Sequence, residues 1–310
     1  MKWVLKNMKI LITGGMGFIG LHLVDYLLKK GNKIIVLDNF SNSNKNLIKK
    51  IQNKNLRIIE GDIRKIDDIV NSMENQEVVI HLAAKISVNE SIENPNETFD
   101  VNVNGTKNVL KACKQNNIKK LIVASSAAVY GEGDKKIKVK EEKKKNPISP
   151  YGESKMKMEE EIEKNNSSNE MDYIILRFFN IYGIGQTSEY AGVITKFLEK
   201  IKKNQSLTIT GDGTQIRDFV SISDVICSIN DAIGYNKSGI FNIASGNKIT
   251  INELANLMIE LSGKKLDIKN MADKQGEIKY SQANILLAKQ KLGYVSKINL
   301  KEGIKKLLEK

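Results

Sequence analysis

The sequence is poor in the residues that build disulfide scaffolds and metal centres. Among its 310 residues are only two cysteines and two histidines. Cys113 and Cys227 have neither metal-ligand nor redox-motif spacing, so we expect reduced thiols and a cytoplasmic protein. His22 and His81 lie in different segments of the chain, and we therefore expect no metal site.

Long hydrophobic runs are also missing. No apolar run approaches the roughly 18 residues that a membrane-spanning helix needs. The first residues, MKWVLKN, lack the apolar stretch and the cleavage site of a signal peptide, so we expect no membrane partner. With 41% hydrophobic residues, the chain can bury a sizeable core as one large domain or about two.

Arginine is scarce, although the formal net charge is +13. The only arginines are Arg57, Arg64, Arg177 and Arg217, so the positive charge comes nearly all from lysine. The densest basic run, KKIKVKEEKKK at residues 135–145, is interrupted by two glutamates and contains no aromatic ring on which a nucleobase could stack. We interpret this run as a solvated loop and expect no nucleic-acid partner.

Short apolar runs alternate with helical patterns through the first half of the chain. Six of these runs predict buried strands, at residues 9–13, 33–38, 56–62, 77–84, 119–126 and 172–180. Helices are predicted after the first strand and at about 96–116 and 150–164. Near-continuous apolar strands separated by helices indicate an α/β fold, a Rossmann-type doubly wound parallel sheet covered on both faces.

The second half is less regular and has neither a repeat nor a Pro- or Gly-rich linker. Helical patterns near 190–203, 223–234, 250–262, 283–292 and 299–310 accompany strand-like runs at 206–210 and 239–245. We expect residues 1–178 to form a nucleotide-binding domain and residues 179–310 a smaller α/β substrate-binding domain. Segments around 217–245 are expected to return to the first domain.

A glycine-rich turn, TGGMGFIG, joins the first predicted strand to the first helix. Gly14 allows a tight turn, Gly17 lets a pyrophosphate approach the helix N-terminus, and Gly20 lets helix and strand pack closely. Asp38 ends the second strand, 18 residues after Gly20. A carboxylate there accepts hydrogen bonds from the adenosine ribose and repels a 2′-phosphate, so the pattern predicts NAD rather than NADP as cofactor.

The segment SPYGESK, at residues 149–155, places a phenol and an amine on one face of a helix. Pro150 suits the first turn and Ser149 the N-cap, so Tyr151 and Lys155 are related as i and i+4. A free tyrosine has a pKa of about 10. A neighbouring ammonium and a positively charged nicotinamide ring both favour the phenolate, which predicts a tyrosine that acts as a general base.

These segments occur in order with others that together resemble one family. They are HLAA (81–84), VNVNGT (101–106), SSAAVYG (125–131) and GDGTQIRDFV (211–220). With EGDI (60–63), they make the chain similar to the NAD-dependent epimerase/dehydratase family, the extended short-chain dehydrogenases/reductases, and most similar to its sugar-nucleotide 4-epimerases. The resemblance covers nearly the whole chain and implies a homodimer, through a bundle of the helices near 96–116 and 150–165.

The resemblance also implies roles for individual residues. It implies a catalytic hydroxyl at Ser126, beside Tyr151 and Lys155. It implies further contacts with the cofactor, at Phe18, Ile19, Asn39, Asp62, Ile63, Leu82, Ala83, Ala84, Asn102 and Ser125. Lys155 would bind the nicotinamide ribose as well.

The positions after Ser126 bear on the reaction. Dehydratases of the family carry an Asp-Glu pair there and decarboxylases usually a Glu, whereas this chain has Ala127 and Ala128. Methyl groups cannot exchange protons. The resemblance therefore implies the simplest outcome, in which a 4-keto sugar turns over in the site and C4 is inverted.

For the substrate, the resemblance implies a UDP-hexose held by Asn180 and Arg217, with Lys85 near the sugar. Lys274 stands where the family often has a second diphosphate-binding arginine, and it keeps the charge but not the planar fork. Ser281 stands where some 4-epimerases have a tyrosine that closes the sugar pocket. A small residue there suggests that N-acetylated hexoses are accepted alongside UDP-glucose and UDP-galactose.

Two alternatives remain open. One is another enzyme of the family, either a UDP-glucuronate 4-epimerase or a dehydratase or reductase of a different nucleotide sugar. The other is a catalytically silent relative that binds NAD or RNA. Such relatives usually lose the tyrosine or the lysine, and this chain keeps both.

Overall fold

The computed structural model describes residues 7–43, 45, 53–165, 171–186, 192–272 and 278–309. Its centre is a seven-stranded sheet in the order β11-β6-β5-β4-β1-β2-β3, in which every neighbouring pair is parallel. The strands are β1 (Lys9–Thr13), β2 (Lys33–Asp38), β3 (Leu56–Glu60), β4 (Val78–His81), β5 (Lys120–Ser126), β6 (Asp172–Phe178) and β11 (Gly239–Ile243). This is the predicted Rossmann-type sheet.

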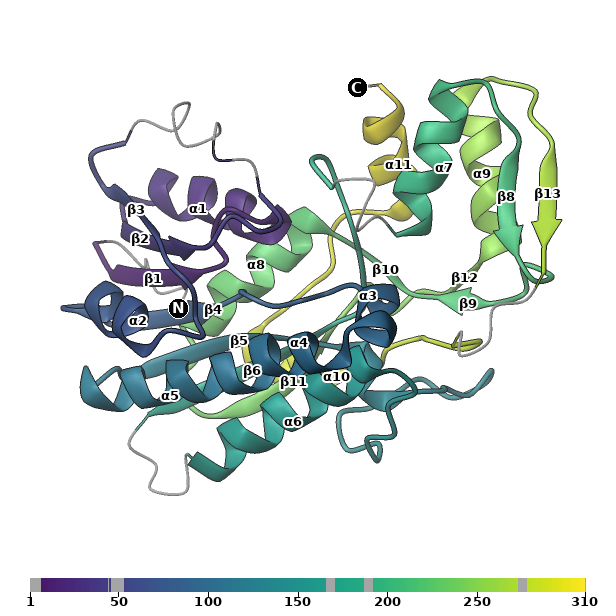
Figure 1. The fold of residues 1–310 in the computed structure, drawn as a ribbon. Helices are drawn as coiled ribbons and strands as arrows, with labels where there is room; N and C mark the ends of the chain where they lie inside the picture. The colour runs from purple at the N-terminus through teal and green to yellow at the C-terminus, as the bar shows by residue number, and fades with distance from the viewer. Residues whose placement is uncertain are drawn as a thin grey trace.

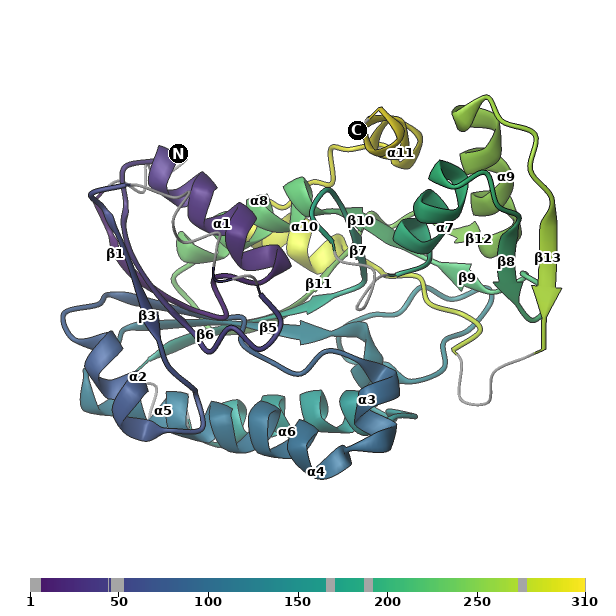
Figure 2. The same cartoon turned by 45° about the horizontal axis from the view of Figure 1, so that its top comes forward.

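Helices cover both faces of this sheet (Figures 1 and 2). One face packs on α1 (Phe18–Lys29), α8 (Ile222–Ile233) and α10 (Leu286–Leu292), and the other on α2 (Ile66–Met73), α5 (Gly105–Gln115) and α6 (Pro150–Asn165). Strands buried on both faces need near-continuous apolar residues, and the middle of β1 and all of β4 are fully buried. β1 continues to β2 on one side and has β4 on the other, so the strand order reverses there and leaves a crevice at the carboxyl ends.

A second core lies beside the sheet. It is formed by α7 (Val193–Lys202), α9 (Ile251–Ser262) and α11 (Leu300–Leu308), which pack with the parallel pair β8 (Leu207–Thr210) and β13 (Ile268–Met271). The short pairs β7 (Asn180–Tyr182) with β10 (Phe219–Ser221), and β9 (Ile216–Arg217) with β12 (Ile249–Thr250), lie between the two parts (Figure 2). None of the described helices is long and apolar enough to cross a membrane.

One predicted helix is interrupted in the structure. The helix predicted at 96–116 is three pieces, α4 (Pro95–Phe99), the π-helix η2 (Asp100–Asn104) and α5, and α3 (Val88–Glu93) precedes them. A π-helix such as η2 has a wider turn than an α-helix and is often found at functional sites. Here η2 lies beside the loop that follows β4.

The basic run at 135–145 is only partly the solvated loop that we predicted. Val139 is buried, its N–H donates to Gln282 O, and its O accepts from Asn284 N. The Glu141 carboxylate accepts the N–H of Asn242 in β11. Burial, the largest cause, raises the pKa of Glu141. The run is therefore fixed to the sheet through its backbone and through some of its charged side chains, and from Val139 to Lys145 alternate residues are at least partly buried.

Candidate active site

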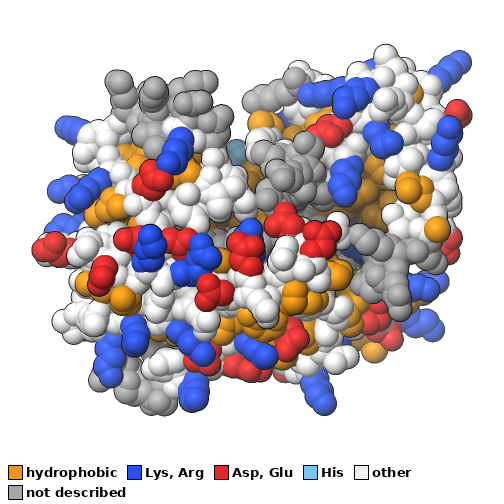
Figure 3. Space-filling view, in the orientation of Figure 1, with side chains coloured by type: hydrophobic (Ala, Val, Ile, Leu, Met, Phe, Trp, Pro, Cys, Tyr) orange, Lys and Arg blue, Asp and Glu red, His pale blue; other side chains and the backbone are white. Residues whose placement is uncertain are grey.

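A cavity of about 1060 Å³ lies at the carboxyl ends of the strands and extends to α7. In the space-filling view the surface is hollowed between the two parts of the molecule (Figure 3). Its lining includes most of the residues that the sequence singles out: Gly14, Gly17, Phe18, Ile19, Gly20, Asp38, Asn39, Asp62, Ile63, Leu82, Ala83, Ala84, Lys85, Ser125, Ser126, Tyr151, Lys155, Asn180 and Arg217. Residues from distant parts of the chain thus meet in one site.

The glycine turn forms a cradle at the N-terminus of α1. Gly14 has φ +69°, and a Cβ there would lie 2.6 Å from the backbone N of Ala83. A Cβ on Gly20 would lie 2.5 Å from the backbone of Gly15. Gly17 is different, because a Cβ there would meet only Gly14 O at 3.4 Å.

Protein atoms therefore do not require glycine at position 17, whereas a ligand that approaches the backbone would. Gly17 is the N-cap of α1, and neither a side-chain cap nor an acidic residue occupies the first turn. The free N–H groups of that turn are a ready site for an anion. This cradle fits the pyrophosphate of a dinucleotide.

Two carboxylates lie at the other end of the cradle. Asp38 is almost fully buried and accepts hydrogen bonds from the N–H groups of Met16 and Phe40, at 2.9 and 2.8 Å. Asp62 accepts a fork of hydrogen bonds from Arg64, at 3.0 and 2.7 Å, and one from Asn39. These bonds, led by the one from Arg64, hold the pKa of Asp62 well below its usual range. Both groups are fixed acceptors, as an adenosine site requires.

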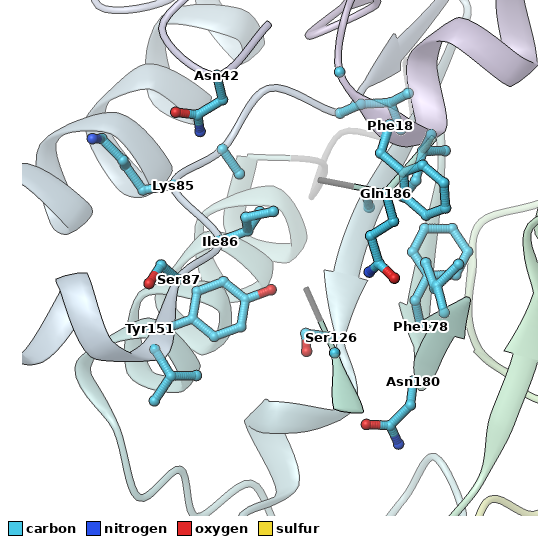
Figure 4. A pocket seen from close by; sticks show the side chains of 18 of the residues that line it. Phe18, Asn42, Lys85, Ile86, Ser87, Ser126, Tyr151, Phe178, Asn180 and Gln186 are labelled. Atoms are coloured by element: carbon cyan, nitrogen blue, oxygen red, sulfur yellow. The ribbon is translucent and has the colours of Figure 1, made fainter. Parts of the chain in front are cut away.

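The proposed catalytic pair meets as predicted. Ser149 caps α6 by accepting the N–H of Gly152 at 3.1 Å, and Tyr151 follows in the first turn. Ser126, at the end of β5, lines the same cavity and lies near the Tyr151 hydroxyl (Figure 4). Figure 4 shows the Tyr151 hydroxyl pointing into the cavity, with Phe178 and Gln186 across from it.

Protein groups alone do not give Tyr151 the lowered pKa that the sequence predicts. Burial is the largest cause and raises the pKa of the phenol, and the nearby Ser126 hydroxyl opposes this. Lys155 is 4% exposed and donates to Ala124 O at 3.0 Å. Burial lowers the pKa of Lys155 to about 8, against the opposing charge of Glu159. A lowered Tyr151 pKa therefore needs the positive charge of a bound nicotinamide ring.

The substrate-side residues are placed differently from one another. The Asn180 side-chain amide donates to Asp218 O at 3.1 Å, which leaves its Oδ1 for the cavity. Arg217 lies on β9, one residue after Ile216, whose O accepts the N–H of Ser281 at 3.1 Å. Ser281 lies beside the strand of Arg217 but does not line the cavity. Lys274 lies outside the described residues.

Two further predicted site residues, Lys85 and Asn102, pair with other protein groups. The Lys85 ammonium lies 3.4 Å from Glu97 and 3.8 Å from Glu90, and Figure 4 shows this side chain directed away from Tyr151. Asn102 is 1% exposed, accepts the N–H of Lys85 at 2.8 Å and donates to Ser154 at 2.9 Å. Asn102 therefore links the loop after β4 to α6 without lining the cavity.

Among the residues that sequence reasoning missed are Gln186, in the cavity lining, and Asp218, a buried carboxylate next to the lining. Gln186 lines the cavity and accepts a hydrogen bond from Thr195 at 2.8 Å, which fixes its amide. Asp218 is fully buried and accepts the N–H groups of Ser245, Gly246 and Ala283. Its place next to Arg217 was the only signal available. Within the described ranges, no group of His, Cys, Asp and Glu could hold a metal ion.

Comparison with known proteins agrees with this geometry. The model of the NAD dependent epimerase/dehydratase family matches residues 10–244. A protein of Methanocaldococcus jannaschii, named provisionally as a UDP-glucose 4-epimerase, is 41% identical over 303 residues, which are 96% of this chain and 97% of that protein.

Two solved structures are similar over their whole length. The UDP-N-acetylglucosamine 4-epimerase of Methanobrevibacter ruminantium, solved with UDP-N-acetylmuramic acid, is 33% identical with a TM-score of 0.92, covering 98% of each chain. The UDP-glucose 4-epimerase of Thermus thermophilus, solved with NAD, is 30% identical with a TM-score of 0.89. That similarity covers 97% of this chain and 98% of the Thermus chain.

Proposed function

This chain belongs to the NAD-dependent epimerase/dehydratase family, and we propose that it is an isomerase, an NAD-dependent UDP-hexose 4-epimerase. The observation that carries the proposal is that Ser126, Tyr151 and Lys155 line the same cavity as the glycine cradle. A nucleotide site and a proton-transfer site are thus joined. The names of the similar proteins support the same reaction.

The chain's own residues divide the work. When bound, NAD takes up a hydride from a sugar carbon and can return it. Tyr151 takes the proton of the C4 hydroxyl and returns it, because its phenol points into the cavity next to Ser126. Ser126 hydrogen-bonds the reacting oxygen and orients it. Lys155 adds a positive charge on the same face of α6 and, with the cofactor ring, favours the phenolate.

The residues after Ser126 favour epimerisation over elimination of water. Ala127 and Ala128 form the start of the short helix η3 (Ala127–Tyr130), and their methyl groups carry no exchangeable proton. A 4-keto sugar in this site therefore has no acid or base at these positions to lose its 6-hydroxyl. Return of the hydride to the other face of C4 is the remaining outcome.

Binding of the substrate follows from the outer part of the cavity. Arg217 and Asn180, which line the cavity, would hold the diphosphate. The family resemblance adds Lys274 as a further cation. By the family resemblance, Ser281 stands where some 4-epimerases have a tyrosine that closes the sugar pocket, and its N–H donates to the O of Ile216, next to Arg217. We extend the proposal to UDP-N-acetylglucosamine and UDP-N-acetylgalactosamine on this ground.

The setting of the enzyme is part of the proposal. A homodimer would form through α5 and α6, which lie together on the outer layer of the sheet (Figure 2). Residues 1–178 with the returning segments would bind the cofactor, and most of 179–310 the substrate. A cytoplasmic location is supported by the two free cysteines, Cys113 and Cys227.

Proton NMR of the purified full chain with NAD tests this function. UDP-galactose, UDP-N-acetylgalactosamine and UDP-glucuronate are supplied separately, and the anomeric signal of each C4 epimer is followed. We expect UDP-glucose and UDP-N-acetylglucosamine to appear, and Tyr151→Phe to abolish both. Turnover of the glucuronate alone would move the enzyme to the alternative class. Salt-sensitive RNA binding without any turnover would favour the silent relative.

A further inference from the structure

Two side chains of α6 hydrogen-bond the end of β5, and one of these bonds is unexplained by the mechanism. Tyr151 lines the cavity together with Ser126, and Lys155, one turn later, donates to the O of Ala124 at 3.0 Å. Glu159, four residues further, accepts the hydroxyl of Ser125 at 2.6 Å. Residues four apart share a helix face, so Tyr151, Lys155 and Glu159 all face the last three residues of β5.

The carboxylate of Glu159 is completely buried. Its side chain is 0% exposed, and Arg177 on β6 donates a fork of two hydrogen bonds to it, at 2.9 and 2.6 Å. Lys145, from the loop before α6, lies 3.2 Å from the second oxygen. Removing an ion pair from water is costly, so such a pair is poor evidence for stability and calls for another reason.

Arg177, the partner of Glu159, also donates hydrogen bonds to groups on the side away from Glu159. Its guanidinium is 2% exposed and donates to the Tyr130 hydroxyl at 2.8 Å and to Glu141 O at 2.9 Å. Tyr130 donates onward to Asn242 at 2.6 Å. The fork that fixes Glu159 is therefore rigid, since η3, the basic loop and β11 all hold the arginine in one place.

Burial works against the charge on Lys155, and Glu159 works for it. Burial is the larger cause and lowers the pKa of Lys155, while the negative charge of Glu159 raises it. The charged and titratable groups around these two come from every neighbouring element: His81 on β4, Tyr130 on η3, Glu141 and Lys145 in the loop, Tyr151 and Glu163 on α6, and Arg177 on β6. Among them, Glu159 is the one whose charge favours the ammonium.

We propose that Glu159 is a positioning residue for the proposed reaction, on which this inference rests. It fixes the end of β5 against α6, so that Ser126 meets Tyr151, and it holds the Lys155 amine in its charged form. It touches neither cofactor nor substrate and acts through Ser125 and Lys155. The chemistry that it serves is the proton transfer at the sugar hydroxyl.

A titration of Lys155 in the full chain tests this without any sugar. Lysine labelled with ¹³C at Cε is followed by NMR against pH, and the resonance of Lys155 is assigned by its loss in Lys155→Met. We expect a midpoint near 8 in the wild type, and in Glu159→Gln a midpoint lower by about one pH unit. An unchanged midpoint in folded Glu159→Gln would overturn the proposal.

Glu163→Gln is the matched control. Glu163 lies one turn further along α6, is 42% exposed, and also pairs with Lys145, at 3.6 Å. Its loss should leave the Lys155 midpoint unchanged, and an equal shift in both variants would overturn a specific role for Glu159. If Glu159→Gln does not fold, Glu159→Gln with Arg177→Met removes both buried charges, which proteins often tolerate. The midpoint must fall in that variant too.

Kinetics give the second readout. In Glu159→Gln the alkaline limb of the pH profile of kcat should move to lower pH, together with the titration midpoint of Lys155. KM should change less than about twofold. A purely structural role would lower the melting temperature without moving the limb, and that result would refute the inference. If the wild type turns over no sugar, the proposed function fails, and the titration still decides the role of Glu159.

Discussion

Gly17→Ala separates a glycine required by a ligand from glycines required by the fold. A Cβ at Gly17 would meet only Gly14 O, at 3.4 Å, and the backbone angles there, φ −75° and ψ −179°, suit any residue. We therefore expect the free energy of unfolding to change by no more than about 0.5 kcal/mol. Because the added methyl group fills the cavity side of the turn, we expect NAD affinity to fall at least about tenfold, or about 1.4 kcal/mol.

Gly20→Ala is the contrasting variant. Its Cβ would lie 2.5 Å from the C, Cα and O atoms of Gly15, so the turn and α1 must move apart. Overpacking of this kind costs about 1–3 kcal/mol. In this variant, stability and NAD binding should fall together.

Two measurements decide between the cases. Urea unfolding of the NAD-free proteins gives the free energies, and calorimetric titration with NAD gives the affinities. The reasoning about the cradle is refuted if Gly17→Ala binds NAD like the wild type. It is equally refuted if Gly17→Ala loses affinity only in proportion to a loss of stability.

Three further predictions follow from the site. Ser126→Ala should lower kcat about 10²-fold with little change in KM, because the lost hydrogen bond acts on the reacting oxygen; a change in KM alone would contradict this. Burial raises the pKa of Asp218 from 3.8 to about 6, so the folded state binds more protons than the unfolded state between these values. Stability should therefore fall as pH rises through about 6, and urea unfolding at several pH values should show this slope vanish in Asp218→Asn. Ser281→Tyr should suppress turnover of N-acetylated sugars and spare UDP-galactose, and equal loss of both in the NMR assay would remove Ser281 from the pocket.

Local patterns were enough to predict the cofactor half of the site. Gly14, Gly17 and Gly20 lie within one turn, and Asp38 ends the next strand, so their positions follow once β1, α1 and β2 form in order. Tyr151 and Lys155 share a helix face for the same reason. The parallel sheet itself follows from apolar runs too continuous for a strand with one wet face.

The substrate half could be predicted only from resemblance. Ser281 donates its N–H to the O of Ile216, the residue before Arg217, across a sequence separation that no periodicity encodes. Gln186 lies in an irregular segment after β7, where local pattern says nothing about which way a side chain points. Such contacts depend on how the two cores of the protein pack.

The sequence by itself determined the alternation of strands and helices, the glycine cradle and the spacing of Tyr151 and Lys155, because each depends on residues within a few turns of one another. Only the tertiary structure decided which charges are buried together. Glu159 and Arg177 belong to different elements and look like ordinary surface residues in the sequence, but folding places them at 0% and 2% exposure between α6 and β6. Burial and distance set the energy of a charge, and both are properties of the folded chain.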